Sequence, residues 1–328
     1  MKNIKTLKTI TAPIFEDIKL FEKEFRVALH SEVRLVNTIG KYLLRHKGKH
    51  IRPMLTILAS RICGGPNLNS FRAAVMIELL HIATLVHDDV VDEATKRHGF
   101  LSINKLWKNK VAVLMGDFLL SKALINMTGI KDFEALKLIS HTAELLSAGE
   151  ILQIEKSITR SMTEEVYFDM IYQKTASLVA TSCELGALTT SGTKKDRLAM
   201  RTFGTKLGMA FQVKDDLFDL LGDENKTGKD MGADVKRNMI TLPLIHAYST
   251  LSRPESREIK RILKKKRKSA RNLSKVKEII SGAGGFDYAY AKIDEFNNQA
   301  LDAIAPYPES VYKQSMVDLL SFNIHRNH

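Results

Sequence analysis

The sequence of 328 residues contains few residues that would cross-link the chain or interrupt its helices. Its two cysteines, Cys63 and Cys183, are too few for a disulfide framework or a cysteine-rich zinc site, and we expect both to be small core residues in a reducing compartment. None of the seven prolines lies between Pro66 and Pro243. Because proline interrupts helices, this long interval can hold uninterrupted helices.

The sequence also lacks targeting and linker segments. Its first residues have no continuous apolar stretch of the secretory type, and no later apolar run reaches the roughly 18 residues of a membrane span. We therefore expect a cytoplasmic protein. No Gly/Ser-rich linker, internal repeat or low-complexity segment divides the chain, which favours a single domain over residues 1–328.

Positive charge is in excess, with 50 Lys and Arg against 37 Asp and Glu. This balance favours anionic partners, which include nucleic acids, membrane headgroups and phosphorylated small molecules. The lack of a recognisable basic and aromatic module argues against nucleic acid. The run KRILKKKRK, residues 260–268, is typical of a solvated helix face or loop, and peripheral contact with an anionic membrane is its functional alternative.

Apolar residues recur at helical spacing through the central interval, which predicts an all-α protein. A first helix spans residues 69–94, with Asn69 and Ser70 as candidate caps. It is apolar on nearly all sides and should be buried. Its polar residues fall within about a third of the circumference, which predicts that they line a cavity. These residues are Glu78, His81, Asp88, Asp89 and Asp92.

Two further helices carry polar residues on one side. In residues 201–223, Gln212, Asp215 and Asp219 share a face and Asp216 lies at its margin, while Gly204 and Gly208 would admit a close neighbouring helix. A third helix should start near residue 161, where Ser161 and Glu164 fit a capping box. It places Lys174 on the face of Tyr167, Ile171 and Leu178, with Thr175 alongside.

Each of the first two helices contains an Asp-Asp-x-x-Asp set, and no His or Cys accompanies either set at ligand spacing. Carboxylates with water and a substrate phosphate are the usual ligands of Mg²⁺. A single set could be a solvated, acidic helix end. Two sets on apolar helices indicate bound cations, because burying unpaired carboxylates costs several kcal/mol each.

These motifs resemble those of the all-trans isoprenyl diphosphate synthases, or polyprenyl synthetases, over nearly the whole chain. The matching segments, in the family's order, are GKHIRP, HDDVVD, GEILQ, QKTASL and FQVKDDLFD. The resemblance implies one large helical bundle around a deep central cavity, the isoprenoid synthase fold, and a homodimer. It also implies a transferase that adds isopentenyl diphosphate to an allylic diphosphate, with three Mg²⁺ ions between the aspartate rows and the allylic substrate.

The resemblance assigns roles to individual residues. Direct Mg²⁺ ligands would be Asp88, Asp92 and Asp215, supported by Asp89, Asp216 and Asp219. Contacts to the allylic diphosphate would come from Arg97, Lys174 and Lys229. The catalytic residues would be Lys174 together with Thr175 and Gln212, whose oxygens match those that face the allylic cation. Isopentenyl diphosphate would be held by Lys49, Arg52 and His81, and by the residue at position 98.

This chain departs from the family pattern at three positions. The second of two usual arginines is His98, which is charged only part of the time near pH 7, so we expect a weaker isopentenyl diphosphate subsite. A usual lysine is absent near Met239, and Lys47 replaces a frequent glycine. These changes leave open a partner-dependent or regulatory subunit of a two-chain synthase as an alternative.

The residues just before the first aspartates bear on product length. In the family, bulky residues about one turn before the first aspartates limit the chain, and the small Ala83 and Thr84 occupy those positions here. We expect an open tunnel with a deeper floor, for which Phe118 is a candidate, and a product of about C35–C45. A farnesyl or geranylgeranyl diphosphate synthase is the shorter-chain alternative. The second aspartate set argues against a terpene cyclase, and a phosphohydrolase would leave that set without a role.

Overall fold

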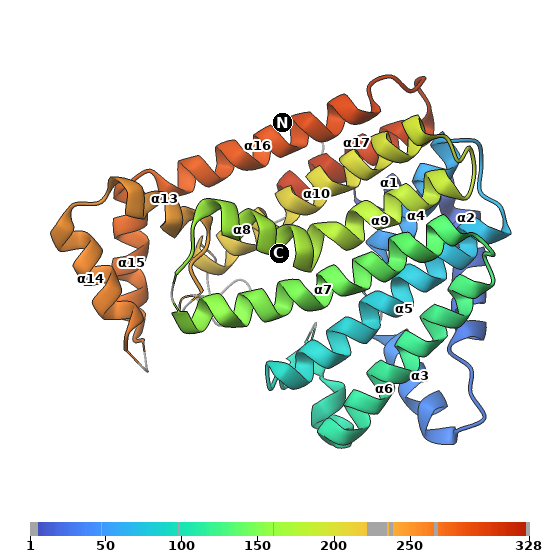
Figure 1. The fold of residues 1–328 in the computed structure, drawn as a ribbon, viewed down its shortest axis with the longest axis horizontal. Helices are drawn as coiled ribbons and strands as arrows, with labels where there is room; N and C mark the ends of the chain where they lie inside the picture. Colours follow the sequence, from blue (N-terminus) through green and yellow to red (C-terminus); the bar gives the residue numbers. More distant parts are fainter. Residues whose placement is uncertain are drawn as a thin grey trace. The chain divides into compact units, whose positions relative to one another are not determined.

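The computed structural model describes residues 6–46, 48–97, 99–159, 161–221, 235, 239–265 and 268–325. Most of these residues are helical, which confirms the all-α prediction (Figure 1). The sequence did not predict the short antiparallel pair of β1 and β2, in which Lys96 lies opposite Leu101 and Arg97 opposite Phe100. The elements, in chain order, are α1 (Leu7–Ile10), η1 (Ala12–Ile14), α2 (Phe15–Ala28), α3 (Arg34–Arg45), α4 (Ile51–Ile62), α5 (Leu68–Val91), β1 (Lys96–Arg97), β2 (Phe100–Leu101), α6 (Ile103–Thr128), α7 (Phe133–Thr159), α8 (Glu164–Ile171), η2 (Tyr172–Ala176), α9 (Ser177–Leu188), α10 (Lys194–Leu221), α13 (Leu242–Thr250), α14 (Arg253–Leu263), α15 (Ala270–Gly282), α16 (Gly285–Ile304) and α17 (Val311–His325).

Backbone contacts divide the chain into two compact units. Unit 1 comprises Met1–Ala143, Leu178–Gly204 and Ala303–Leu319. Unit 2 comprises Glu144–Ser177, Thr205–Asp302 and Leu320–His328. The interpretation of residues 1–328 as a single domain stays a prediction.

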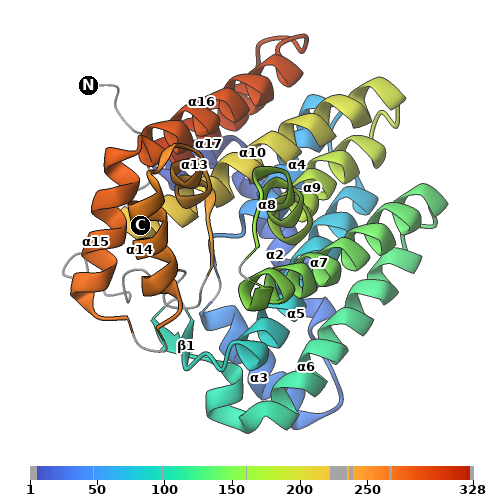
Figure 2. The same cartoon turned by 60° about the vertical axis from the view of Figure 1, so that its left-hand side comes forward.

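The central helix of unit 1 is α5, which packs against α2, α4 and α6 (Figure 2). It is buried along most of its first half, as its apolar composition predicts. Its N-cap is Asn67 rather than Asn69, because the Asn67 side chain accepts hydrogen bonds from the backbone N–H groups of Asn69 and Ser70. Cys63 and Cys183 are free and buried, as expected for core residues.

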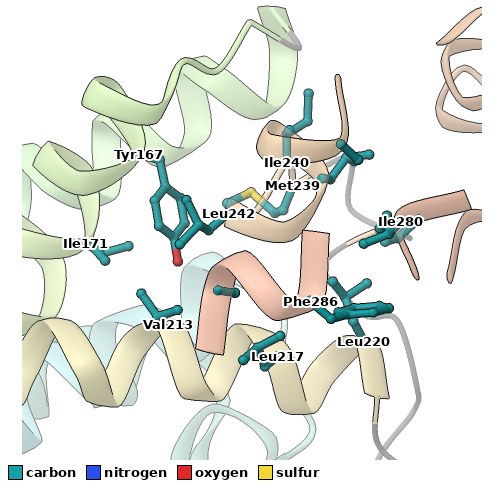
Figure 3. Close-up of a cluster of buried hydrophobic side chains, with 14 of the residues drawn as sticks. Tyr167, Ile171, Val213, Leu217, Leu220, Met239, Ile240, Leu242, Ile280 and Phe286 are labelled. Carbon is teal, nitrogen blue, oxygen red and sulfur yellow. The ribbon is translucent and has the colours of Figure 1, made fainter. Parts of the chain in front are cut away.

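Unit 2 has its own hydrophobic core, in which Tyr167 of α8 and Val213 and Leu217 of α10 lie close together (Figure 3). The N-cap of α8 is Thr163, whose hydroxyl accepts a hydrogen bond from the Val166 N–H. The predicted cap, Ser161, is therefore wrong by two residues. The helix continues beyond α8 through η2, a π-helical turn, into α9, so the register of its faces changes at that turn.

Two helix pairs approach each other closely at a glycine, at Gly204, which was predicted, and at Gly116, which was not. A Cβ atom at Gly204 of α10 would lie 2.7 Å from the Cα of Ala180 on α9, which confirms the close approach predicted there. In the first aspartate region, a Cβ at Gly116 of α6 would lie 2.2 Å from Nε2 of His87 on α5. At Gly204 the opposing atoms belong to the backbone of α9, so only a residue without a side chain fits there. At Gly116 the opposing atoms are those of the His87 ring, which would have to move to admit a side chain.

Helix α6 differs from the sequence expectation in one respect. By length and composition alone it could span a membrane, and 33% of the residues in its most apolar stretch are buried. A single helix of this kind among the described residues is weak evidence for a membrane span, because core helices have the same composition. The helix is also interrupted at Lys108, whose φ of 69° and ψ of 161° separate its first turn from the rest.

Candidate active site

The first aspartate row lies at the C-terminal end of α5, in unit 1. Asp88 is half-buried, Asp92 is exposed and forms the C-cap, and Asp89 between them is buried, with 3% of its surface exposed. The last turn of α5 contains no basic residue. Because the C-terminal end of a helix carries partial negative charge, carboxylates there are destabilised unless a cation approaches. The row is therefore a site that favours cations.

Unit 2 repeats this arrangement on α10. Asp219 lies in the last turn before Leu221, and Asp215 is one turn earlier; both are half-buried. The last turn again contains no basic residue. The middle carboxylate, Asp216, is buried, with 6% of its surface exposed. In each row, then, the second aspartate points into the protein and the outer two are more accessible.

The buried aspartate of the first row is paired with Arg97 of β1. Asp89 Oδ1 accepts hydrogen bonds from the Arg97 Nε at 2.8 Å and contacts its Nη2 at 2.8 Å. The Asn104 side chain donates to the backbone carbonyls of Asp89 and Ala94, at 3.0 and 3.1 Å. Arg97 was predicted as a diphosphate contact. The structure shows that Asp89 orients its guanidinium, so the two residues act as a pair.

The predicted isopentenyl diphosphate residues lie together in unit 1. Arg52 Nη1 is 2.9 Å from His81 Nε2, across the start of α4 and the middle of α5. The Arg52 Nε is buried and has no hydrogen-bond partner among the described residues. Burial lowers the pKa of Arg52, and the nearby Glu78 carboxylate opposes that change. Lys49 precedes this cluster and is exposed. The cluster offers fork-shaped and point-charge donors to an anion.

A second buried pair supports this cluster. His50 Nδ1 lies 2.9 Å from Glu78 Oε1, and both side chains are buried. His50 caps α4 with a left-handed backbone, at φ 49° and ψ 36°. Its ring also contacts the edges or faces of Phe21 and Phe25, at centroid distances of 5.5 and 6.0 Å. Glu78 and His81, one turn apart on α5, thus hold two alternate residues of the GKHIRP segment.

In unit 2, a chain of hydrogen bonds connects three predicted site residues to Tyr167. The Thr175 hydroxyl donates to Gln212 Oε1 at 2.7 Å, and the Gln212 amide donates to Asp216 Oδ1 at 2.8 Å. The Tyr167 hydroxyl donates to Asp216 Oδ2 at 2.6 Å. Figure 3 shows the Tyr167 side chain among the apolar residues of the core. Asp216 is therefore fixed from both sides by neutral donors.

The environment of Asp216 shifts its ionisation. Burial raises the pKa of Asp216 to about 6, and the carboxylate of Asp219 acts in the same direction. The hydrogen bonds from Tyr167 and Gln212 and the charge of Lys174 lower the pKa and offset part of this effect. A cation bound by the row would stabilise the ionised form. The row is thus better suited to the metal-bound than to the metal-free state.

Lys174 lies in the π-helical turn η2, where it faces α7. Its Nζ is 2.5 Å from Glu150 Oε2 and donates to Gln153 Oε1 at 3.0 Å. A Cβ at Gly149 would lie 2.7 Å from the Lys174 backbone nitrogen, so glycine allows α7 to approach the turn. Such turns widen a helix locally and are frequent at functional sites. Here the turn places Lys174 and Thr175 next to each other in unit 2.

The two aspartate rows suit a small hard cation whose remaining ligands come from a substrate phosphate and water. Among the described residues, no three His, Cys, Asp or Glu side chains form a ready-made metal cage. Mg²⁺ is usually held by one or two carboxylates, with water and substrate phosphate completing the octahedron. Each row supplies accessible carboxylates and no sulfur or imidazole ligand, as that coordination requires.

Several positions that the sequence singles out lie outside the described residues or in the interior of the protein. His98 and Lys229 lie outside the described residues, as does Lys47. Met239, where a cation is usual in the family, is buried in the hydrophobic core of unit 2. Ala83 is buried, with 2% of its surface exposed, and the Thr84 hydroxyl donates to the His81 carbonyl at 2.8 Å.

The sequence reasoning missed several residues that support the site. Glu78 and Tyr167 were named from the sequence without partners, and His50 and Glu150 were not singled out. The signal for Glu150 and Gln153 was present in GEILQ, where the two residues are three apart on one helix face. No local sequence feature predicts the His50–Glu78 pair, because its partners are separated by 28 residues.

An all-α chain in which each of two helices ends in an Asp-Asp-x-x-Asp row has the features of an isoprenyl diphosphate synthase. Residues 33–280 match the family model described as polyprenyl synthetase. The chain therefore belongs to the polyprenyl synthetase family and is a prenyltransferase.

Named relatives agree with this membership. An all-trans-nonaprenyl-diphosphate synthase (geranyl-diphosphate specific) of Rhodobacter capsulatus is 35% identical over 324 residues, 97% of each chain. Component 2 of the heptaprenyl diphosphate synthase of Bacillus subtilis (strain 168) is 36% identical over 233 residues, 71% of this chain and 67% of that protein. The crystal structure of a polyprenyl synthase from Caulobacter crescentus CB15, complexed with calcium and isoprenyl diphosphate, has a TM-score of 0.91 and 27% identity and covers 100% of both chains.

Proposed function

We propose that this prenyltransferase condenses isopentenyl diphosphate with an allylic diphosphate in a Mg²⁺-dependent reaction and releases an all-trans polyprenyl diphosphate of about C35–C45 and diphosphate. The observation that carries the proposal is the pair of carboxylate rows at negative helix ends. The complex of the Caulobacter relative with calcium and isoprenyl diphosphate supports the use of a divalent cation. The nonaprenyl and heptaprenyl relatives support a long product.

The allylic substrate must lose its diphosphate to form a carbocation. Bound Mg²⁺ would supply positive charge to the leaving group. Asp88, Asp92 and Asp215 are the proposed direct ligands, and Lys174 adds a positive charge that Glu150 and Gln153 hold in place. The oxygens of Thr175 and Gln212 are the proposed partners of the cation. Donors oriented in advance lower the barrier because they need little reorganisation during the reaction.

Isopentenyl diphosphate is the proposed ligand of Lys49, Arg52 and His81. The Arg52 Nε, buried without a partner among the described residues, is a donor suited to a phosphate oxygen. The double bond of this substrate attacks the carbocation, the new carbon–carbon bond forms, and the resulting cation loses a proton to the departed diphosphate. We assign no side-chain base to this step.

The two rows are tested by replacing Asp88 or Asp215 with alanine. Each change should raise the Mg²⁺ concentration for half-maximal rate and reduce kcat at least about 100-fold, as is usual when transition-state charge loses its stabilisation. The control is Asp302→Ala, an exposed carboxylate of unit 2. If the Asp88 and Asp215 variants retained the Mg²⁺ dependence of the unmodified enzyme, the assignment of the rows as metal ligands would be wrong.

Product length is proposed to depend on Ala83. This residue is buried one turn before His87, which packs on Gly116. A tyrosine at position 83 should block the growing chain, and Ala83→Tyr is expected to shorten the product by several isoprene units in mass spectrometry. Thermal unfolding of the variant is the control, because overpacking without a tunnel would lower Tm and leave the product length unchanged.

We also propose a homodimer whose two subunits contact each other through α6. Four large apolar side chains of this helix are exposed by 40–63%, and they recur along one side: Val113, Leu114, Leu124 and Ile125. A second copy covering them would remove this surface from water. Sedimentation should give a dimer that Leu114→Glu dissociates, and a monomeric unmodified protein would contradict the proposal.

A second candidate function is a synthase that requires a partner chain. It is favoured by the similarity to component 2 of the heptaprenyl synthase and by Met239, which is buried where the family usually has a cation. Prenyl transfer that appears only after a second polypeptide is added would establish it.

The cellular location is also a proposal. We propose that the enzyme works in the cytoplasm, which is consistent with two free, buried cysteines. The basic run at 260–268 is a proposed contact with anionic membranes; in it Lys260, Arg261, Lys264 and Lys265 are exposed. Recovery of the native protein in a membrane-free cytosolic or salt-extractable fraction would support this location, and extraction by detergent alone would contradict it.

A further inference from the structure

Unit 1 has a surface, here called the α3 face, that combines exposed apolar and cationic side chains. It consists of one side of α3, the β1–β2 pair and the first turn of α6, which lie together at one edge of the unit (Figure 2). Its four large apolar side chains are 41–48% exposed: Leu35, Phe100, Leu101 and Leu106. Single exposed apolar residues are ordinary, but a group on adjoining elements marks a binding surface.

A groove in this face has an aromatic wall. Its lining residues are Thr38, Lys41, Tyr42, Arg45 and Trp107. The rings of Tyr42 and Trp107 meet edge to face at 5.4 Å, and the Tyr42 hydroxyl donates to the Leu101 carbonyl at 2.6 Å. The side chains are thus fixed to one another across α3, the strand pair and α6. These contacts hold the lining side chains of the groove in place.

The charge of the face is of one sign. Residues 34–49 and 96–110 contain no Asp or Glu. Lys41 and Arg45 project from the same side of α3, four residues apart, and Lys105 and Lys108 are exposed on α6. In the part of the chain that the structure describes, none of these four cations forms an ion pair with a carboxylate. They remain available to an external anion.

We propose that the α3 face docks on the surface of anionic phospholipid membranes. Lys41 and Arg45 would contact headgroup phosphates, while Trp107 and the exposed apolar side chains enter the interfacial layer. Tryptophan and tyrosine prefer that layer because they are apolar at one end and polar at the other. Each cation near an anionic leaflet contributes about 1 kcal/mol. The apolar side chains favour a membrane over a nucleic acid, which would leave them in water.

The surface differs from the basic run on α14. Among the described residues of α14 and α15, no large apolar side chain is exposed, and Glu255 and Glu258 lie among the cations. That region can attract an anionic surface but has nothing to insert. The α3 face has both components, so it is the insertion surface. The need for such docking rests on the proposed function, because a long polyprenyl product must reach a membrane.

The chain contains a single tryptophan, and it lies in the groove. Trp107 emission therefore reports docking directly on the full-length protein, without substrate. Vesicles of phosphatidylcholine with 30 mol% phosphatidylglycerol should shift the emission to shorter wavelength, and brominated phosphatidylcholine in the same vesicles should quench it. Pure phosphatidylcholine vesicles should do neither. Prenyl transfer from soluble substrates is measured in parallel, so failure of docking is distinguished from failure of the proposed function.

A double variant that combines Lys41→Gln and Arg45→Gln should weaken vesicle partitioning about 30-fold, as expected for the loss of two cations. The matched control, Lys260→Gln with Arg261→Gln, removes the same charge from α14 and should keep the Trp107 shift. The proposal is overturned if vesicles leave the emission unchanged, or if the control pair abolishes the shift while the α3 pair retains it. It is also overturned if DNA, and not vesicles, shifts the emission, or if the α3 pair acts by changing the oligomeric state.

Discussion

The buried carboxylate of the second row provides a quantitative test of the site. Replacing Asp216 by asparagine keeps its size and removes its charge. The new amide can accept from Gln212 and donate to the Tyr167 hydroxyl after small reorientations, so the packing is retained. We expect the metal-free variant to gain stability relative to the unmodified protein at neutral pH, because an unfavourably buried negative charge is removed.

The size of this effect follows from the pKa. Burial raises the pKa of Asp216 from 3.8 to about 6, which corresponds to about 3 kcal/mol at about 1.4 kcal/mol for each tenfold change in ionisation. Since the folded-state pKa is the higher one, the stabilising contribution is fully present below pH 3.8 and is lost as the pH rises through about 6. Between pH 4.5 and pH 8 the linkage amounts to about 2 kcal/mol.

Urea unfolding in the presence of EDTA at pH 4.5 and pH 8 measures this difference. The free energy of unfolding of Asp216→Asn, relative to the unmodified protein, should be about 2 kcal/mol more favourable at pH 8 than at pH 4.5. Titrating groups that do not interact with Asp216 are common to both proteins and cancel. Asp302→Asn, which removes an exposed charge in the same unit, should show no such difference. An equal effect of Asp216→Asn at both pH values would show that burial does not raise the pKa of Asp216.

Three further substitutions test separate parts of the site. Glu78→Gln removes the buried charge that holds His50. It should raise the KM for isopentenyl diphosphate several-fold and leave the KM for the allylic substrate unchanged. Equal changes in the two KM values would indicate a general loss of structure. Gly149→Ala places a Cβ 2.7 Å from the Lys174 backbone nitrogen. It should lower kcat and reduce the free energy of unfolding in urea by about 1–3 kcal/mol. Unchanged activity and stability would show that α7 can shift to accept the added methyl group. His98→Arg adds a permanent cation and should lower the KM for isopentenyl diphosphate in steady-state kinetics. If the KM did not fall, the histidine would not be the cause of a weak subsite.

The aspartate rows were predictable because their chemistry is local. Three carboxylates at spacing i, i+1 and i+4 on an apolar helix cannot be core residues without cations, so Asp88 and Asp215 point to metal before any fold is known. The all-α architecture was equally predictable, from the helical spacing of apolar residues in the proline-free interval. The small strand pair was not, because two residues per strand carry no periodicity.

Other features depend on contacts between distant segments. Helix starts at Asn67 and Thr163 were displaced by two residues from the predicted caps, since several polar residues compete near each start and backbone geometry selects one. The π-helical turn at 172–176 lies close to α7 at Gly149, and spacing within η2 does not predict this contact. The orientation of Arg97 by Asp89 likewise follows from the strand pair that the sequence did not predict.

Product analysis directly tests the proposed synthesis of a long polyprenyl diphosphate. Purified protein is incubated with Mg²⁺, farnesyl diphosphate and labelled isopentenyl diphosphate, and the dephosphorylated products are identified by mass spectrometry. We predict a ladder of all-trans polyprenols that ends at about C35–C45 and disappears when EDTA is added. A lack of incorporation by the protein alone, with both substrates and Mg²⁺ saturating, would contradict it.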